Sequence, residues 1–167
     1  MYKDMCNDVR RLIAVYVVSI PIERFLSGAT ESAADFTQDL LNDLFSIVFY
    51  YELASRIRFL RPSPSTDRST LSKKLAKSST LLVVNQYLTS RAFTPTPGKF
   101  LTAMGLTLTS HYVISPLMTK FKNMGIDLSK FSDSLETIVV LSLANNSIYD
   151  TAAKAISLLI FQLAFKW

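Results

Sequence analysis

Few side chains in this sequence have the type and spacing that catalysis or metal binding needs. Its 167 residues include one histidine, His111, and one cysteine, Cys6. Structural zinc sites take four ligands of these kinds, and a Ser–His–Asp triad needs a carboxylate beside its histidine. Residues 104–118, which surround His111, contain no Asp or Glu. We therefore expect a protein that is not an enzyme and that binds no metal or cofactor.

Polar residues inside apolar segments are a second place to look for chemistry. Glu52 and Arg56 stand one helical turn apart, and so do Asp150 and Lys154, so each pair can form an ion pair. Pairing would allow partial burial of Glu52 and Arg56. Such groups usually hold helices together, although inside a membrane they also mark proton or ion pathways. The intramembrane candidates are Glu52, Arg56, Asn85, His111, Asn145, Asn146 and Asp150.

The composition favours lipid and protein partners. Hydrophobic residues make up 49% of the chain and charged residues 19%, and the mean hydropathy is +0.26. Typical globular proteins have about 25% charged residues. The net charge of +5 could suit nucleic acid, but the basic residues are not interleaved with aromatic residues in one block. We therefore expect a membrane and other subunits as partners, and no nucleic acid.

Residues 100–119 are the longest stretch without a charged residue. Twenty helical residues extend about 30 Å, which matches the apolar thickness of a bilayer. Small residues recur here at spacings of four, three and four: Gly98, Thr102, Gly105 and Thr109. Such a stripe lets another helix approach closely. We expect it to contact a helix of this chain or of a partner, and we expect Pro116 to kink the end of the segment.

Apolar periodicity predicts the other helices. We expect helices over residues 5–26, 33–60 and 78–93, and either one long helix or two short ones, broken near Asn146, over residues 134–167. The sequence Thr-Pro-Thr-Pro-Gly at 94–98 is a tight break, which predicts a helical hairpin between residues 78–93 and 100–119. Residues 120–133 are expected to form a loop.

A basic linker is expected at residues 61–77, which contain two prolines and several Ser and Thr residues. Its basic residues are Arg61, Arg68, Lys73, Lys74 and Lys77. A solvated connection explains this composition, and contact with lipid headgroups is an alternative.

Together these segments predict one all-α domain over residues 1–167, built as a membrane-embedded bundle of about four to five short helices. A soluble all-α bundle is the alternative. If the segments cross a membrane in turn, most of the 18 Lys and Arg residues fall on one side. The positive-inside rule then puts the amino terminus on the cytoplasmic side of an integral membrane protein.

The leading hypothesis for function is a structural membrane protein that tethers or scaffolds a larger assembly, such as the inner membrane of a virion or an organellar complex. A small transporter or channel that uses the intramembrane polar residues is the second hypothesis. The third is a soluble all-α interaction module that docks an acidic partner on its basic linker. Detergent dependence separates the third hypothesis from the first two.

Overall fold

The computed structural model describes residues 2–28, 33–60, 68–91, 94–125, 129–145 and 148–165. Every regular element in these ranges is helical, which confirms the all-α fold class. The elements are α1 (Tyr2–Leu26), α2 (Ala33–Arg56), the 3-10 turn η1 (Arg58–Leu60), α3 (Arg68–Ser90), α4 (Pro97–Thr109), the π turn η2 (Ser110–Ile114), α5 (Ser115–Asn123), α6 (Ser129–Asn145) and α7 (Ile148–Phe165).

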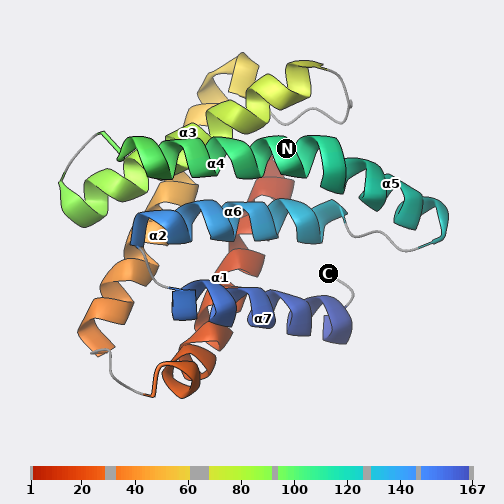
Figure 1. Ribbon diagram of the computed structural model, residues 1–167. Coiled ribbons are helices and arrows are strands. Elements are labelled where there is room, and N and C mark those ends of the chain that lie inside the picture. Colours follow the sequence, from red (N-terminus) through yellow and green to blue (C-terminus); the bar gives the residue numbers. More distant parts are fainter. Residues whose placement is uncertain are drawn as a thin grey trace.

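The helices form two crossed groups. Helices α4, α6 and α7 lie side by side, and α1 and α2 cross behind them at a steep angle (Figure 1). Helix α1 packs mainly on α7, and α3 contacts α2, α4 and α6. Helix α3 therefore joins the two groups.

The predicted hairpin is confirmed, because α4 packs on the second half of α3. The hydroxyls of Ser78 and Thr107 are 2.7 Å apart near one end of the pair. At the other end the Lys99 ammonium donates to the amide oxygen of Gln86 at 3.3 Å. Pro97 occupies the first turn of α4, where its missing N–H costs no helical hydrogen bond.

The expected linker at residues 61–77 is wrong over its second half, because α3 already begins at Arg68. Lys73, Lys74 and Lys77 are therefore helical residues. Lys, Leu and Ala are strong helix formers and dominate residues 71–77, which outweighs the charge that suggested a loop. Arg61 and the side chain of Arg68 lie outside the described residues.

The expected loop at residues 120–133 is also partly wrong, since α5 runs to Asn123 and α6 starts at Ser129. Lys120 and Lys122 fall in the last turn of α5, where positive charge interacts favourably with the helix dipole. Gly125, with φ of +87°, takes the left-handed conformation that follows a helix end. The carboxyl-terminal segment forms two helices, as the second of the two alternatives predicted.

Residues 97–123 are helical without a break, and the π turn η2 precedes Pro116. Proline lacks the N–H that an α-helix needs, and a wider turn accommodates that loss. The Ser115 hydroxyl donates to the carbonyl oxygen of Ser110 at 3.0 Å within this turn. In the part of the chain with described coordinates, no helix has both the length and the apolar character that crossing a membrane requires.

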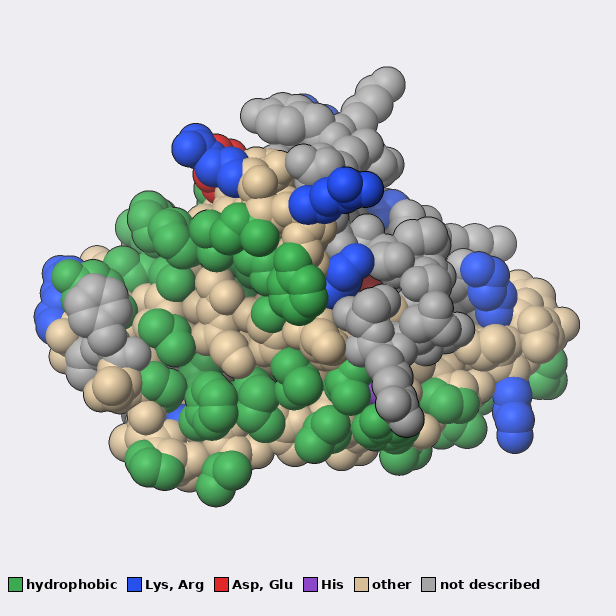
Figure 2. Space-filling model, turned by 90° about the horizontal axis from the view of Figure 1, so that it is seen from above, with side chains coloured by type: hydrophobic (Ala, Val, Ile, Leu, Met, Phe, Trp, Pro, Cys, Tyr) green, Lys and Arg blue, Asp and Glu red, His purple; other side chains and the backbone are tan. Residues whose placement is uncertain are grey.

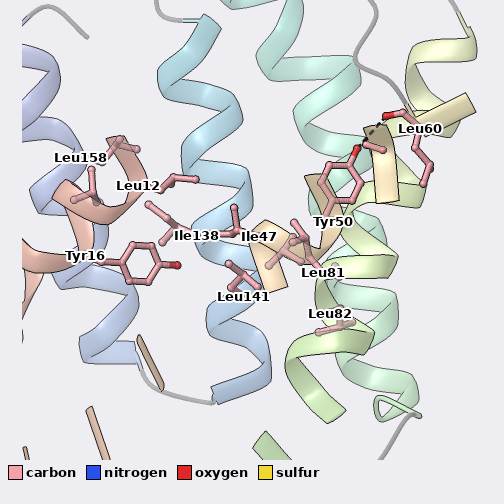
Figure 3. Packing of buried hydrophobic residues seen from close by; sticks show 14 residues of the cluster. Leu12, Tyr16, Ile47, Tyr50, Leu60, Leu81, Leu82, Ile138, Leu141 and Leu158 are labelled. Carbon is pink, nitrogen blue, oxygen red and sulfur yellow. Dashed lines mark hydrogen bonds between the residues drawn. The ribbon is translucent and has the colours of Figure 1, made fainter. Parts of the chain in front are cut away.

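The hydrophobic core lies where α1, α2, α3, α6 and α7 meet. Ile138 and Leu141 of α6 face Ile47 of α2 and Leu81 of α3 at its centre (Figure 3). All four side chains are almost completely buried. Burial of this kind is the main stabilising term in folding.

Candidate functional site

A buried ionic cluster lies beside this core, at the junction of α2 and α7. Lys154 of α7 is 1% exposed. Its ammonium donates to Oδ2 of Asp43, on α2, at 2.7 Å and to Oδ2 of Asp150 at 2.5 Å. The spacing predicted the Asp150–Lys154 pair, and the structure confirms it. One ammonium group thus faces two carboxylates.

Asn85 extends the cluster to α3. Its amide nitrogen donates to Oδ1 of Asp43 at 2.5 Å, so both oxygens of that carboxylate accept a hydrogen bond. The Thr89 hydroxyl lies 3.3 Å from the amide oxygen of Asn85, which fixes the orientation of the amide. Satisfied donors and acceptors make burial of such groups tolerable.

Tyr16 closes the cluster from α1. The Lys154 ammonium lies 4.4 Å from the centre of the Tyr16 ring, within the range of a cation–π contact. The ring reaches from α1 toward Leu141 of α6 (Figure 3). The buried Tyr16 hydroxyl has no hydrogen-bond partner among the described residues. Burial, and then the charges of Asp43 and Asp150, raise the pKa of Tyr16 well above its usual range.

The protonation of Lys154 follows from its two neighbours. Burial by itself would lower the pKa of the ammonium group, but the charges of Asp43 and Asp150 outweigh burial and raise it. Lys154 therefore stays charged, and Tyr16 stays neutral, at neutral pH. Neither group is suited to exchange protons there, because a general acid or base works best with a pKa near the operating pH.

Each polar member of the cluster occupies the inward stripe of its own helix. On α2, Asp43 is followed by the buried residues Ile47, Tyr50 and Ala54 at helical spacing. The sequence did not lead us to select Asp43, Tyr16 or Lys154 as site residues. The regular spacing of Asp43 with the apolar stripe was the available signal.

The cluster is suited to hold helices together. The Lys154 ammonium group joins α1, α2 and α7, and Asn85 links α3 to it through Asp43. Within the described ranges, no three His, Cys, Asp or Glu side chains come together as metal ligands. A buried charge group of this kind often specifies one arrangement of the helices.

The other predicted polar residues do not gather at this cluster. Glu52 and Arg56 form the expected pair at 2.7 Å, but their side chains are 53% and 76% exposed, so the expected partial burial is wrong. His111 is half-buried in the π turn, edge-on to the ring of Tyr112. The side chain of Asn145, and all of Asn146, lie outside the described residues.

The small-residue stripe faces outward. Gly98, Thr102, Gly105 and Thr109 are all exposed, and a Cβ atom added at Gly98 or Gly105 would meet nothing within 4 Å. The prediction that the stripe packs on a helix of this chain is therefore wrong for the described residues. Helix α4 buries its opposite face instead, through Ala103 and Thr107. Contact with a partner's helix stays a prediction.

The predicted basic residues line a pocket at one end of the bundle. Lys73, Lys74 and Lys77 of α3 and Arg11 of α1 surround a volume of about 240 Å³. The Lys74 ammonium lies 3.8 Å from a carboxylate oxygen of Asp133 and equally far from one of Glu136, both on α6. Tyr50 and Leu60 form part of its apolar wall.

No known protein family, curated protein or solved structure matches this chain.

Proposed function

We propose that this chain is a non-enzymatic structural subunit that works at a membrane within a larger assembly. Lipid and partner subunits cover its apolar helix faces. The main support is the amount of apolar side-chain surface that the fold leaves exposed on consecutive helical turns. Contiguous exposed patches of this kind mark contacts with proteins or membranes.

Helix α2 has the clearest outer apolar face. Leu41, Phe45, Val48 and Phe49 recur at helical spacing and are each between 43% and 55% exposed. Their spacing puts them on the side of the helix away from Asp43 and Ile47, which are buried. The middle of the outer side of this helix is therefore apolar, and Glu52 and Arg56 follow it toward the end of the helix.

Helix α7 repeats the pattern. Ile156, Leu159, Ile160 and Leu163 are exposed, whereas its charged residues Asp150 and Lys154 are buried. A different face, seen from above and nearest to α3 and α4, also has hydrophobic side chains over much of its area (Figure 2). Pairing the charges inside removes a cost that free charges would have in lipid.

In its more specific form, the proposal places the assembly at the inner membrane of a virion or in an organelle. It also places the amino terminus on the cytoplasmic side. The bias of Lys and Arg toward alternate segments supports the orientation. A transporter receives no comparable support, because the polar candidates are divided between the buried cluster and the exposed surface.

Membrane fractionation with alkaline carbonate extraction tests the proposal. We expect the full chain to stay in the membrane pellet and to enter solution only with detergent. A variant with Phe45→Ser and Phe49→Ser should be extracted more readily, because it loses two exposed aromatic rings without touching the core. The control is Ser55→Ala, which changes α2 six residues beyond Phe49, the last residue of the apolar face. Release of the wild-type chain by carbonate alone would reject the membrane part of the proposal.

A further inference from the structure

The basic pocket contains more lysines than its ion pairs use. Arg11, Lys73, Lys74 and Lys77 line it, against the acidic residues Asp133 and Glu136. Both acidic residues lie beside Lys74, and Glu136 also accepts a hydrogen bond from the Ser110 hydroxyl at 2.6 Å. In the part of the chain that the structure describes, Lys73 and Lys77 form no ion pair. No carboxylate of the described residues therefore neutralises either ammonium group.

The geometry of α3 points these two charges the same way. Lys73 and Lys77 are one helical turn apart, so their Cβ atoms are separated by about 5–6 Å on one face. Both side chains are half-buried at the pocket. Two ammonium groups on one face of a helix repel each other when both extend toward the same pocket. An anion that bridges them removes this repulsion.

The size and lining of the pocket restrict the anion. Its volume of about 240 Å³ is below the range of about 300–1,000 Å³ that drug-sized ligands occupy. A small anionic group therefore fits better than a whole nucleotide. A phosphate group carries up to two negative charges and several acceptor oxygens, so it can use both ammonium groups at once.

The apolar wall suggests that the phosphate is attached to an organic group. The Tyr50 hydroxyl donates to the carbonyl oxygen of Leu60 at 3.3 Å, which leaves the ring and the leucine as an apolar surface (Figure 3). Burial raises the pKa of Tyr50 to about 12, so this hydroxyl remains neutral and does not repel an anion. Leu12 extends the same wall.

We propose that the pocket lined by Lys73, Lys77 and Arg11 is a phosphate-binding site that takes the headgroup of a phosphate ester. A lipid headgroup and a free phosphate share this chemistry. The phosphate site follows from the pocket alone, whereas a lipid as the source of the phosphate also rests on the proposed function.

The test compares two charge-matched variants of the full chain at about 0.15 M salt, where diffuse attraction beyond about 8 Å is screened, with detergent removed before vesicles are added. The pocket variant carries Lys73→Gln and Lys77→Gln. The control carries Lys120→Gln and Lys122→Gln, two exposed residues of α5 that do not line the pocket. Circular dichroism must show equal helicity, and a Lys73→Arg, Lys77→Arg variant keeps the charge.

The first readout uses vesicles of phosphatidylcholine with or without phosphatidic acid. We expect phosphatidic acid to increase binding of the wild-type chain, and the pocket variant to lose about thirtyfold in affinity for these vesicles. The control should lose less than about threefold, and the arginine variant should bind. Equal losses in the pocket variant and the control would overturn the proposal, because diffuse surface charge would then explain the binding.

The second readout is calorimetric titration with inorganic phosphate. Binding that disappears in the pocket variant means that the phosphate group alone is sufficient. Dependence on phosphatidic acid without binding of inorganic phosphate means that the lipid headgroup is the ligand. The absence of both effects rejects the site. Binding to phosphatidylcholine alone measures the apolar surface, so the proposed function and this site fail separately.

Discussion

The Asp150–Lys154 and Glu52–Arg56 pairs have the same spacing and similar geometry but lie in opposite surroundings. Their closest N–O distances are 2.5 Å and 2.7 Å. Lys154 is 1% exposed, however, whereas the Arg56 side chain is 76% exposed. Water and salt screen the outer pair, whereas the inner pair depends on its protein partners. Equal geometry therefore does not mean equal importance.

A further difference is the number of partners. The Glu52–Arg56 pair links two positions of a single helix, one turn apart. Lys154 also contacts Asp43, which lies 111 residues earlier in the chain, and Asn85 supports Asp43 from α3. The inner pair is thus part of the tertiary structure, and the outer pair stabilises α2 locally. Three predictions test this distinction, and a fourth compares the two faces of α4. They are given in order of decreasing effect.

The largest effect is expected for Lys154→Met, which leaves Asp43 and Asp150 buried without a cation. Removal of one partner from a buried ion pair costs about 3–5 kcal/mol. Arg56→Met is the matched change in the exposed pair and should cost at most about 1 kcal/mol. Chemical denaturation followed by circular dichroism gives both free energies of unfolding.

A third variant sharpens this prediction. Replacing all three charges, with Asp43→Leu, Asp150→Leu and Lys154→Met, leaves no uncompensated charge and should recover much of the lost stability. Similar losses for Lys154→Met and Arg56→Met would contradict the distinction between the two pairs.

The second prediction concerns alkaline pH. Lys154 and Tyr16 have raised pKa values in the folded chain, against ordinary values of 10.5 and 10.0. The folded chain therefore keeps these protons after the unfolded chain has lost them. Stability is full at neutral pH and falls as the pH rises above about 10. The loss should be smaller than that of Lys154→Met, because the neutral amine still fills its site.

Thermal unfolding midpoints between pH 7 and 11 measure this effect. Tyr50 titrates in the same direction, so the comparison must use variants. Tyr16→Phe should weaken the alkaline loss, and Arg56→Met should leave it unchanged. If the Tyr16→Phe variant and the wild type lost the same stability at alkaline pH, other groups would be responsible for the loss.

Asn85→Leu is the third prediction. The change removes the donor to Oδ1 of Asp43 but keeps a side chain of similar size in α3. Loss of a hydrogen bond to a buried charged group costs about 1–3 kcal/mol. Gln38→Leu, at an exposed site on α2, removes a hydrogen bond of 3.1 Å to the neutral Asn42 side chain one turn away and should cost about 0.5 kcal/mol or less. Equal small effects would mean that the amide does not support the cluster.

Sequence analysis predicted the features that depend on neighbouring residues. Periodicity gave the helices, the Thr-Pro-Thr-Pro-Gly break gave the α3–α4 hairpin, and the four-residue spacing gave the Asp150–Lys154 pair. The basic start of α3 was misassigned because charge and prolines suggested a linker, although Lys, Leu and Ala favour a helix.

The partners of the Asp150–Lys154 pair on other helices could not be predicted, because they depend on which helix faces meet. Asp43 and Asn85 come from α2 and α3, and their sequence positions alone do not place them beside α7. The prediction that the stripe of Gly98 and Gly105 packs on a helix of this chain was wrong for the same reason. Small residues permit close approach but do not require it, and α4 packs through its other face.

The smallest effect is expected for Gly105→Leu on the outer face of α4. A Cβ atom there meets nothing within 4 Å, so the added side chain has room. Leucine is also the better helix former, and the variant should be more stable than the wild type by roughly 0.5–1 kcal/mol.

Ala103→Leu is the matched change on the buried face, where overpacking costs about 1–3 kcal/mol. Thermal unfolding of the purified chains should therefore move in opposite directions for the two variants. A lower midpoint for Gly105→Leu would mean that the stripe is covered even in the isolated chain. A stabilised chain that no longer co-purifies with its membrane assembly would instead assign the stripe to a partner's helix.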